Sequence, residues 1–555
     1  MSGRLPPPVI VGPSAWVGSH LSKKRKLWHS RWSNNEIKHL EHAAEHFISS
    51  SVDLVNISKN NFPLPLIENR LKNLQHKLIS GIGFELISGL PIEKYSIEES
   101  STIFCGIGSH LGKARSQNSS GHILGHVRDT GVNVKDKKIV SLTDRNGPDF
   151  SPKESPNGKH IAYLGYQDRA QAYQNTELLI MDSTGKNKRV LSFNIDSSIS
   201  SFYWASNNKG IYCTYDKFGD TKIAYLNLEG SAKDLAKNLG GNSIGRPYGG
   251  GSFSISKNGV IAYTNTSYKH PSELTVINGK KINQITNLSF QLLKNRTLGV
   301  VEEVWYKSSF DNRDIQGWVV YPPNYNPEKE YPFLVENHGG PISNYGSRFS
   351  AEVQLFAAAG YIVFYPNPRG STSYGEEFAN LLHHNYPAED YLDVMDGVDF
   401  CVKNGIAHEN MLYVTGGSAG GLMTAWMIGK NNRFKSAVVV KPVMNWISKT
   451  LTADNYFQYS DTRLKGQPWE NFQEYWDFSP ISLVGDIETP TMVMVGMEDL
   501  RTPPSEAKQL YHGLKLRKIP TVLVEIPEAS HAIANRPSNL ITKVAHILAW
   551  FKKHP

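Results

Sequence analysis

In the second half of the chain, short apolar runs alternate with amphipathic stretches of helical period. The runs are GWVVYP (317–322), PFLVEN (332–337), YIVFYP (361–366), MLYVTG (411–416), SAVVVK (436–441), TMVMVG (491–496) and TVLVEI (521–526), and helical patterns cover 389–403, 419–430, 504–516 and 537–553. This alternation predicts an α/β domain over 301–555, with helices on both faces of a mostly parallel sheet. The first run precedes any helix, so we expect it to form an antiparallel edge strand.

Residues 138–300 are rich in Gly, Asn, Ser and Tyr and carry an internal repeat. SPNGKHIAY ends at Tyr163, ASNNKGIY at Tyr212 and SISKNGVIAY at Tyr263, and each is a turn followed by a strand. A spacing of about 50 residues suits one four-stranded blade of a β-propeller. Because only three copies are visible, we expect a partial β-propeller of about three blades.

Residues 1–137 have a different texture and predict a truncated α+β segment. They contain two helical patterns, NNEIKHLEHAAEHFISS and PLIENRLKNLQHKLISG, and a glycine-rich portion. His42 and His46 in HAAEH match the spacing of a zinc-peptidase motif. They lie in a polar amphipathic helix, however, so we expect no metal there.

Charge and composition exclude several classes of function. The net charge is +8, but the basic residues are scattered among acids, and we interpret the one dense run, KKRK (23–26), as a solvated surface. Without a basic stripe interleaved with aromatic residues, we expect no nucleic-acid partner. The first 16 residues lack the apolar core of a signal peptide, and no apolar run approaches the ~20 residues of a membrane helix. We therefore expect a cytoplasmic protein.

The three cysteines predict neither a zinc site nor a disulfide framework. Cys105, Cys213 and Cys401 are far apart and odd in number, and the chain contains no CxxC pair. The sequence therefore predicts no metal and no cofactor.

A glycine-rich segment, YVTGGSAGGLMTAW (413–426), joins one predicted strand to the next helix. Gly416 and Gly420 lie two positions before and two positions after Ser418. Small residues at these places allow the sharp strand–turn–helix elbow that exposes the nucleophile of an α/β-hydrolase. Since the strand and the helix are both predicted, we interpret Ser418 as a nucleophile rather than as a serine in a plain glycine-rich loop.

A serine nucleophile needs a base and an acid, and the later strands supply candidates. In this fold the chain order is Ser, then Asp or Glu, then His, with the last two on loops after later strands. Asp499 follows the strand 491–496, and His531 follows the strand 521–526. Glu498 competes with Asp499 for the role of the acid, and we favour Asp499. His531 would take the serine proton, and the carboxylate would hold its tautomer.

The residues that would bind the oxyanion and the substrate are less clearly marked by sequence motifs. Backbone N–H groups of Ala419 and of Gly340, the latter in the HGGP turn after the strand 332–337, are the expected oxyanion donors. Trp446 and Tyr456 follow the strand after the elbow helix. In one interpretation they line an apolar substrate pocket, and in the other they belong to the core. Arg369 in NPRGS either braces the active-site loops or forms a surface salt bridge.

Taken together, these motifs resemble those of one peptidase family. HGGP, NPRGSTSYGEEF (367–378), GGSAGG, EDLRTP and ASH are similar to motifs of the prolyl oligopeptidase family of serine peptidases, closest to its acylaminoacyl-peptidase and dipeptidyl-peptidase-like branch. The resemblance covers about 138–555. It implies a hydrolase domain that carries Ser418, Asp499 and His531, and an N-terminal propeller that restricts access to short peptides. Family members usually have about seven blades, so the gating that the family implies does not carry over directly.

The N-terminal segment resembles a different family. FPLPLIENRLKNLQHKLISGIGFELISGLPIEKYSIEE and GIGSHLGKARSQNSSGHILGHVRDTG, within about 28–131, are similar to the start of iron(II)/2-oxoglutarate dioxygenases of the taurine-dioxygenase type. Those enzymes bind iron with two histidines and a carboxylate. No His-x-Asp motif occurs in the chain, so we expect no oxygenase activity.

Three functions compete at this stage. The first is a serine peptidase that releases aminoacyl or dipeptidyl units from oligopeptides through an acyl-enzyme. The second is a carboxylesterase, because the elbow and its partners serve acyl transfer in general. The third is a catalytically silent fusion of two truncated reading frames, since three blades leave open strand edges. The motifs favour the peptidase.

Overall fold

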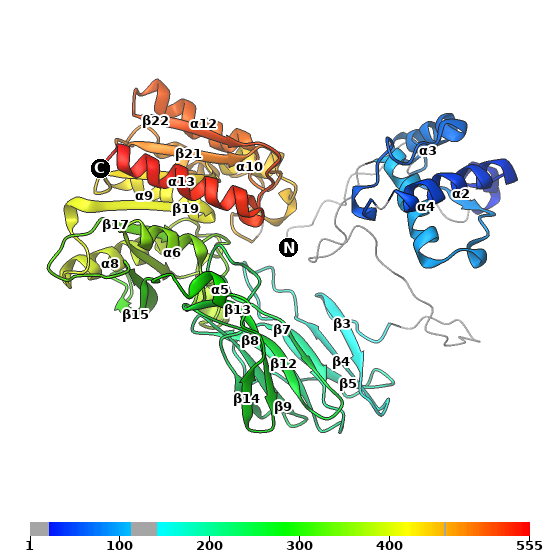
Figure 1. Cartoon of the computed structure of the whole chain (residues 1–555), viewed down its shortest axis with the longest axis horizontal. Helices are drawn as coiled ribbons and strands as arrows, with labels where there is room; N and C mark the ends of the chain where they lie inside the picture. The colour runs from blue at the N-terminus through cyan, green and yellow to red at the C-terminus, as the bar shows by residue number, and fades with distance from the viewer. Residues whose placement is uncertain (1–20, 51, 113–140, 460–461) are drawn as a thin grey trace. The chain divides into compact units, whose positions relative to one another are not determined.

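The computed structural model describes residues 21–50, 52–112, 141–459 and 462–555. The chain divides into two compact units, 1–139 and 140–555, each of which is considered by itself (Figure 1). The first 16 residues and the GHVRDTG stretch used in the sequence analysis lie outside the described residues.

The first unit is a small bundle of helices with a short two-stranded sheet. Helices α2 (Asn34–Ser49), α3 (Glu68–Ser80) and α4 (Ile97–Leu111) enclose an apolar core that includes Leu40, Phe47 and Phe62. Strands β1 (His29–Arg31) and β2 (Leu86–Ser88) pair in parallel. Both α2 and α4 begin with capping boxes, in which a serine and a glutamate three residues later satisfy each other's backbone N–H. The resemblance of this segment to dioxygenases stays a prediction.

The second unit begins with three four-stranded antiparallel sheets, each a simple up-and-down meander. The first contains β3 (Asp149–Glu154), β4 (His160–Gly165), β5 (Glu177–Asp182) and β6 (Arg189–Val190); the second β7 (Ile199–Trp204), β8 (Gly210–Lys217), β9 (Asp220–Asn227) and β10 (Ala232–Ala236); the third β11 (Phe253–Ile255), β12 (Ile261–Ser267), β13 (His270–Asn278) and β14 (Lys281–Gln284). The repeated tyrosines Tyr163, Tyr212 and Tyr263 all lie on the second strand of their sheet. The internal repeat therefore corresponds to one sheet per copy.

Consecutive sheets pack against each other in the same manner. The first and second share one apolar cluster, and the second and third share another. Polar contacts also recur at the repeat distance: the Trp204 indole donates to the Lys153 carbonyl oxygen, and the Ser206 hydroxyl donates to that of Lys257, each 51 residues apart in sequence. The three meanders thus form one continuous stack.

An eight-stranded mixed sheet forms the rest of the second unit. Its order is β15-β16-β18-β17-β19-β20-β21-β22. The strands are β15 (Val300–Lys307), β16 (Asp314–Tyr321), β17 (Phe333–Asn337), β18 (Ile362–Asn367), β19 (Leu412–Ser418), β20 (Ser436–Pro442), β21 (Thr491–Gly496) and β22 (Thr521–Ile526). From β18 to β22 neighbouring strands are parallel, so the prediction of a mostly parallel sheet is confirmed.

The expected edge strand at 317–322 needs a correction. It forms β16 and is antiparallel as predicted, but β15 pairs outside it and occupies the edge. The sequence of β15, VVEEVWYK, carries two adjacent glutamates and is largely exposed, as suits an edge strand. Because this strand is polar, a pattern of apolar runs does not predict it.

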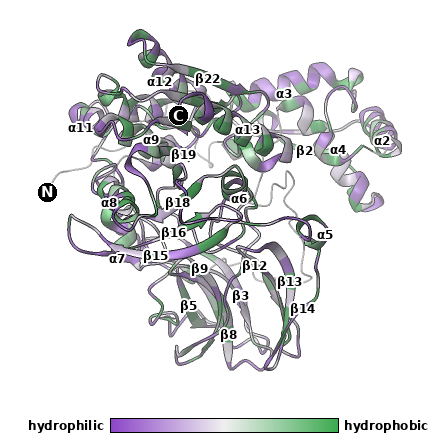
Figure 2. Cartoon of the chain, turned by 60° about the vertical axis from the view of Figure 1, so that its left-hand side comes forward, coloured by the Kyte–Doolittle hydropathy of each residue, from purple (hydrophilic) through white to green (hydrophobic). Residues whose placement is uncertain are grey.

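Helices cover both faces of this sheet (Figure 1). One face packs on α6 (Ala351–Ala358) and α13 (Pro537–Lys553), and the other packs on α8 (Asp390–Lys403), α9 (Ala419–Lys430) and α12 (Pro504–Leu516). Helix α13 carries both hydrophobic and hydrophilic residues (Figure 2). Its Val544, Ile547 and Phe551 are buried against the sheet. Shorter helices are α5 (Phe290–Leu293), α7 (Glu376–Ala379), α10 (Trp446–Thr452) and α11 (Phe472–Asp477). This three-layer core fixes the carboxyl ends of the parallel strands, where sites of such sheets lie.

Two other sequence features are also placed by the structure. His42 and His46 project from the exposed side of α2, and no group of three or more potential metal ligands occurs among the described residues. The KKRK run is exposed. In the described part of the chain, no helix combines the length and the apolar character that crossing a membrane requires.

Candidate active site

Ser418 lies at a sharp turn between β19 and α9. Its backbone has φ 63° and ψ −122°, a strained conformation for a residue with a side chain, and α9 begins at the next residue. The turn closes so tightly that a Cβ on Gly416 would lie 2.2 Å from the Gly420 carbonyl oxygen. A Cβ on Gly420 would lie 2.1 Å from the Asn337 carbonyl oxygen. Glycine at both positions is therefore a steric requirement of this elbow.

The structure brings Ser418, His531 and Asp499 together in a hydrogen-bonded chain. His531 Nε2 is 3.0 Å from Ser418 Oγ, and His531 Nδ1 is 2.8 Å from Asp499 Oδ2. Asp499 is fully buried and also accepts hydrogen bonds from the backbone N–H groups of Arg501 and Thr502. Glu498, the other candidate acid, is exposed to solvent. The geometry thus places Asp499 against the imidazole.

Burial and charge tune both groups of this pair. Burial alone would raise the pKa of Asp499, but hydrogen bonds from His531 and Thr502 outweigh it, so the pKa falls below its ordinary value. Burial lowers the pKa of His531, and the nearby Lys441 and Arg501 lower it further, against the opposing effect of Asp499. The imidazole is therefore neutral near pH 7 and able to accept a proton.

The two predicted oxyanion donors border one cavity beside Ser418. Ala419 is the first residue of α9, so its N–H has no partner within the helix and lies at the positive end of the helix dipole. Gly340 lies in the HGGP turn with φ 129°, and both residues line the cavity. The preceding N–H, that of Gly339, is already engaged, because it donates to Tyr248 Oη at 2.7 Å. The N–H groups of Gly340 and Ala419 therefore stay the predicted oxyanion donors.

His338 supports the same turn without taking part in proton transfer. Its Nδ1 lies 2.9 Å from the Gly339 carbonyl oxygen, and its Nε2 lies 3.0 Å from Ser371 Oγ. Burial lowers its pKa to about 4, so the ring is neutral near pH 7.

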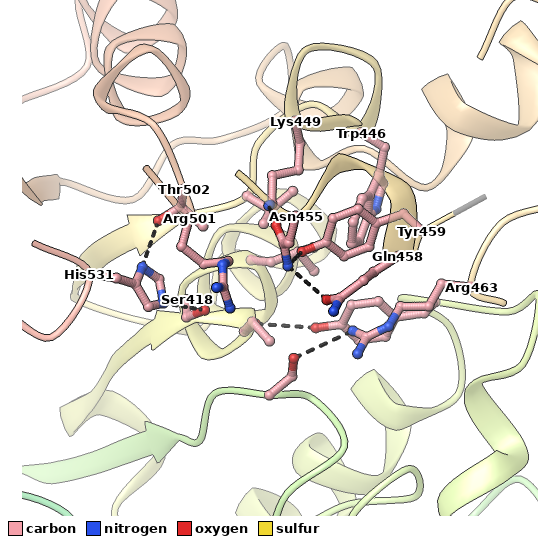
Figure 3. A pocket seen from close by; sticks show the side chains of 15 residues that line it. Ser418, Trp446, Lys449, Asn455, Gln458, Tyr459, Arg463, Arg501, Thr502 and His531 are labelled. Atoms are coloured by element: carbon pink, nitrogen blue, oxygen red, sulfur yellow. Dashed lines mark hydrogen bonds between the residues drawn. The ribbon is translucent and has the colours of Figure 1, made fainter. Parts of the chain in front are cut away.

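The cavity has a volume of about 240 Å³ and is walled mainly by the segment after β20 (Figure 3). Trp446, predicted as a pocket residue, lines it and is buried. Tyr456 does not line it; its side chain is 61% exposed. Tyr459, three residues later and buried, takes the place expected for Tyr456. Register within this short irregular segment decides which aromatic side chain turns inward, and an apolar pattern does not encode it.

Among the described residues, the side chains of this cavity that carry a fixed charge are all cationic. Lys449, Arg463 and Arg501 line it, and no carboxylate does so among the described residues. Arg463 Nη1 donates to the Gly340 carbonyl oxygen at 3.4 Å, and Lys449 Nζ donates to Asn455 (Figure 3). The sequence analysis did not select these residues, because single cations in a loop carry no distinctive pattern.

Arg369 forms a buried ion-pair network rather than a surface salt bridge. It donates two hydrogen bonds of 2.8 Å to the Asp393 carboxylate and also contacts Asp311. Arg369 and Asp393 are 3% and 0% exposed, respectively. The pair fixes the loop after β18 to α8.

Two contributors came from parts of the chain that the motifs do not cover. Tyr248 belongs to the segment between β10 and β11, and it reaches the HGGP turn 91 residues away. Lys441 Nζ donates to the His531 carbonyl oxygen at 2.5 Å. For Lys441 a signal existed, since a lysine ends the buried run SAVVVK at the carboxyl edge of the sheet.

Comparison with known proteins gives consistent matches. The chain is 35% identical over 357 residues to the uncharacterized peptidase YuxL of Bacillus subtilis, covering 63% of this chain and 53% of that protein. It is 25% identical over 430 residues to dipeptidyl-peptidase 5 of Schizosaccharomyces pombe, covering 76% of this chain and 61% of that protein. The chain therefore spans between half and two thirds of the length of these relatives.

Solved structures show the same fold. The acylaminoacyl peptidase of Pyrococcus horikoshii superposes with a TM-score of 0.64 at 22% sequence identity, over 72% of this chain and 62% of that one. At this identity the likeness concerns the fold alone. Residues 347–555, which contain all three side chains, match the model of the Prolyl oligopeptidase family.

Proposed function

We propose that the chain is a serine peptidase of the prolyl oligopeptidase type that hydrolyses short peptides through an acyl-enzyme on Ser418. The observation that carries the proposal is the continuous hydrogen-bonded chain from Ser418 Oγ through His531 to the buried Asp499. The family match over 347–555 supports a serine-type peptidase over a general acyl-transfer enzyme.

Acylation uses each group of this arrangement in turn. Neutral His531 accepts the Ser418 proton at Nε2 while Oγ bonds to the carbonyl carbon of the substrate. The imidazolium is stabilised by Asp499, and the oxyanion is stabilised by the N–H groups of Gly340 and Ala419. His531 then returns the proton to the amine as the C–N bond breaks.

Deacylation uses the same groups with water in place of the amine. His531 takes a proton from water, the hydroxide attacks the ester carbon, and the proton passes to Ser418 Oγ as the C–O bond breaks. The products are a free acid and the regenerated hydroxyl, so no cofactor is consumed.

The surrounding chain supports short peptides as substrates, releasing aminoacyl or dipeptidyl units. We infer that the three stacked meanders of 138–300 are blades of a partial β-propeller placed before a peptidase domain over 301–555, with 1–137 as a separate segment. Arg348 donates to the carbonyl oxygens of Leu239 and Gly219 at 3.0 and 2.6 Å, which ties the second meander to the peptidase part. A stack fixed in this way limits the approach of large substrates.

A fluorophosphonate probe tests the proposal on the full chain. We expect a covalent adduct on Ser418, located by mass spectrometry, and none in Ser418→Ala. Aryl amides of single amino acids and of dipeptides should then be cleaved, and the same variant should abolish cleavage. Hydrolysis of aryl esters without any amide cleavage would instead establish a carboxylesterase. Absence of an adduct on folded protein would establish a silent chain.

A further inference from the structure

A second cavity borders Ser418 and His531. Its volume is about 260 Å³. It shares Gly340, Ser418 and His531 with the first cavity, but it includes Gly417, the residue before the serine, where the first includes Ala419, the residue after it. The residues that come after His531, 532–535, form part of its wall. The two cavities thus meet at the nucleophile.

Three cations and two carboxylates are built into or behind this second cavity. Arg246 binds Glu336 through Nη2 at 2.7 Å and Glu352 through Nε at 3.4 Å. Lys543 binds Glu352 at 2.5 Å. These four groups pair with one another, whereas Lys441 forms no ion pair in the described structure. One positive charge on the cavity wall is therefore left without a carboxylate.

Asp499 also acts on Lys441 through its charge, but its oxygens are engaged by other groups. Its two oxygens accept hydrogen bonds from His531, from the Thr502 side chain and from two backbone N–H groups. Burial and the charges of Arg246 and Lys543 lower the pKa of Lys441 to about 7. A bound anion would favour its charged form.

The backbone at Lys441 is shaped to present this side chain. Pairing between β19 and β20 skips it, because Gly417 is opposite Val440 and Ser418 is opposite Pro442. Lys441 therefore forms a bulge, with φ 41°, at the end of a buried strand. Bulges of this kind re-aim a side chain, and strained non-glycine residues concentrate at functional sites.

Gly417 leaves room for two cationic groups beside the nucleophile. A Cβ at this position would lie 3.2 Å from Arg246 Nη1 and 3.3 Å from Lys441 Cε. The ion pairs of Arg246 run through Nε and Nη2, and its Nη1 is the guanidinium nitrogen closest to position 417. Together with the Lys441 ammonium, it offers donors suited to a carboxylate.

The direction of proton transfer from His531 indicates that the second cavity takes the leaving side of a substrate. The leaving amine receives its proton from His531 Nε2, so it must depart past the imidazole, next to the loop that walls the second cavity. The aromatic first cavity, with Trp446 and Tyr459, suits the acyl side. The cationic wall then faces the substrate residue on the carboxyl-terminal side of the scissile bond.

We propose that Lys441, aided by Arg246, binds the carboxylate of the leaving residue, so that the substrates are short peptides cleaved next to a free C-terminus. This inference rests on the proposed peptidase function and adds its substrate class. A cavity of about 260 Å³ has room for a single residue rather than for a long chain.

Pairs of peptides that differ only at the C-terminus test the proposed carboxylate site. Each pair carries the same N-acylated residue followed by one alanine, as the free acid or as the amide. A charge-assisted hydrogen bond predicts that wild-type kcat/KM is roughly tenfold higher for the acid. We expect the ratio to approach one in Lys441→Met, through KM of the acid, and to be largely kept in Lys441→Arg. Lys515→Met, an exposed lysine on α12, is the matched control.

A structural role alone would give a different result. Lys441 also holds the His531 carbonyl, and loss of that contact would lower kcat for acid and amide equally and leave their ratio unchanged. Equal wild-type values for the two peptides would overturn the proposal.

Protection of Ser418 from the fluorophosphonate probe separates this proposal from the peptidase function. Acid peptides that protect better than amides, in wild type but not in Lys441→Met, support the carboxylate site even if neither peptide is cleaved, in which case the peptidase function fails alone. Equal protection by acid and amide overturns the carboxylate site.

Discussion

The ammonium of Lys441 lies 2.5 Å from the carbonyl oxygen of His531, the residue whose imidazole lies 3.0 Å from Ser418 Oγ. A cation is thus held beside the group proposed as the general base. It both positions the loop and opposes protonation of the imidazole, since like charges disfavour each other. This relationship makes the pH dependence of activity a test of the site.

The acid limb of the pH profile should lie below the ordinary histidine value of about 6.5. Only neutral His531 accepts the serine proton, so kcat/KM falls as the pH drops through its pKa, which burial first and Lys441 next shift downward. The pKa of Lys441 is about 7, so its ammonium is mostly charged below pH 6.5, where this limb is expected. In Lys441→Met the limb should move to higher pH, measured as kcat/KM from pH 4 to 9 with an uncharged aryl substrate.

Lys515→Met serves as the control for the pH profile, because it removes a charge from an exposed position on α12. Its acid limb should coincide with that of wild type. An unshifted limb in Lys441→Met would mean that the ammonium does not act on the base.

The elbow should not tolerate a methyl group at Gly420. The added Cβ would lie 2.1 Å from the Asn337 carbonyl oxygen and 2.8 Å from that of His338, which are backbone atoms that cannot move aside alone. Gly420→Ala should therefore reduce fluorophosphonate labelling of Ser418 at least about a hundredfold, by displacing the nucleophile and the HGGP turn together. Circular dichroism reports whether the fold survives.

Gly485→Ala is the matched control for the elbow variant. No heavy atom lies within 4 Å of a Cβ at that position, and its φ is not positive. Its labelling rate should equal that of wild type. Normal labelling of Gly420→Ala would show that the elbow is looser than its geometry indicates.

Much of the sheet could be predicted because its strands are buried on both faces. Seven apolar runs correspond to β16–β22, and the helices α8, α9, α12 and α13 fall where periodicity predicts them. Strand β15 escaped, since Glu302 and Glu303 interrupt its apolar pattern at an exposed edge. A strand that is buried on both faces has a continuous apolar run, whereas an exposed edge strand has a much weaker apolar pattern.

The residues of the candidate site also differ in how far the sequence predicts them. Ser418, Asp499 and His531 were selectable because each follows a predicted strand in a fixed chain order. Tyr248 was not, because its contact with Gly339 joins a loop among the meanders to a turn 91 residues away. Nothing in a local pattern encodes such a long-range contact.

Loss of Arg369 should destabilise the peptidase part. Arg369→Met leaves the Asp393 carboxylate, which is 0% exposed, without its two guanidinium hydrogen bonds. Removing one partner of a buried ion pair costs about 3–5 kcal/mol, because an uncompensated charge remains. Urea unfolding followed by tryptophan fluorescence should show a correspondingly lower midpoint.

Arg313→Met is the surface counterpart of that variant. Arg313 pairs with Glu377 at 2.7 Å and with Asp311 at 2.8 Å, and these three side chains are 36%, 67% and 26% exposed, respectively. Exposed pairs contribute about 0–1 kcal/mol, so its midpoint should stay near that of wild type. Similar midpoints for the two variants would remove Arg369 from its bracing role.

Substrates with a blocked amino terminus should be preferred over those with a free one. The first cavity presents Lys449, Arg463 and Arg501, and among the described residues no carboxylate lines it to receive an ammonium group. Repulsion between unit charges near a protein surface amounts to a few kcal/mol at ~4 Å, enough for roughly a tenfold preference in kcat/KM at pH 7. Paired N-acetyl and free-amine peptides measure it, and the pH supplies the control: above about pH 9 the α-amine is uncharged, so the preference should shrink. Faster cleavage of the free amine at pH 7 would show that an acidic group reaches the substrate and recognises its amino terminus.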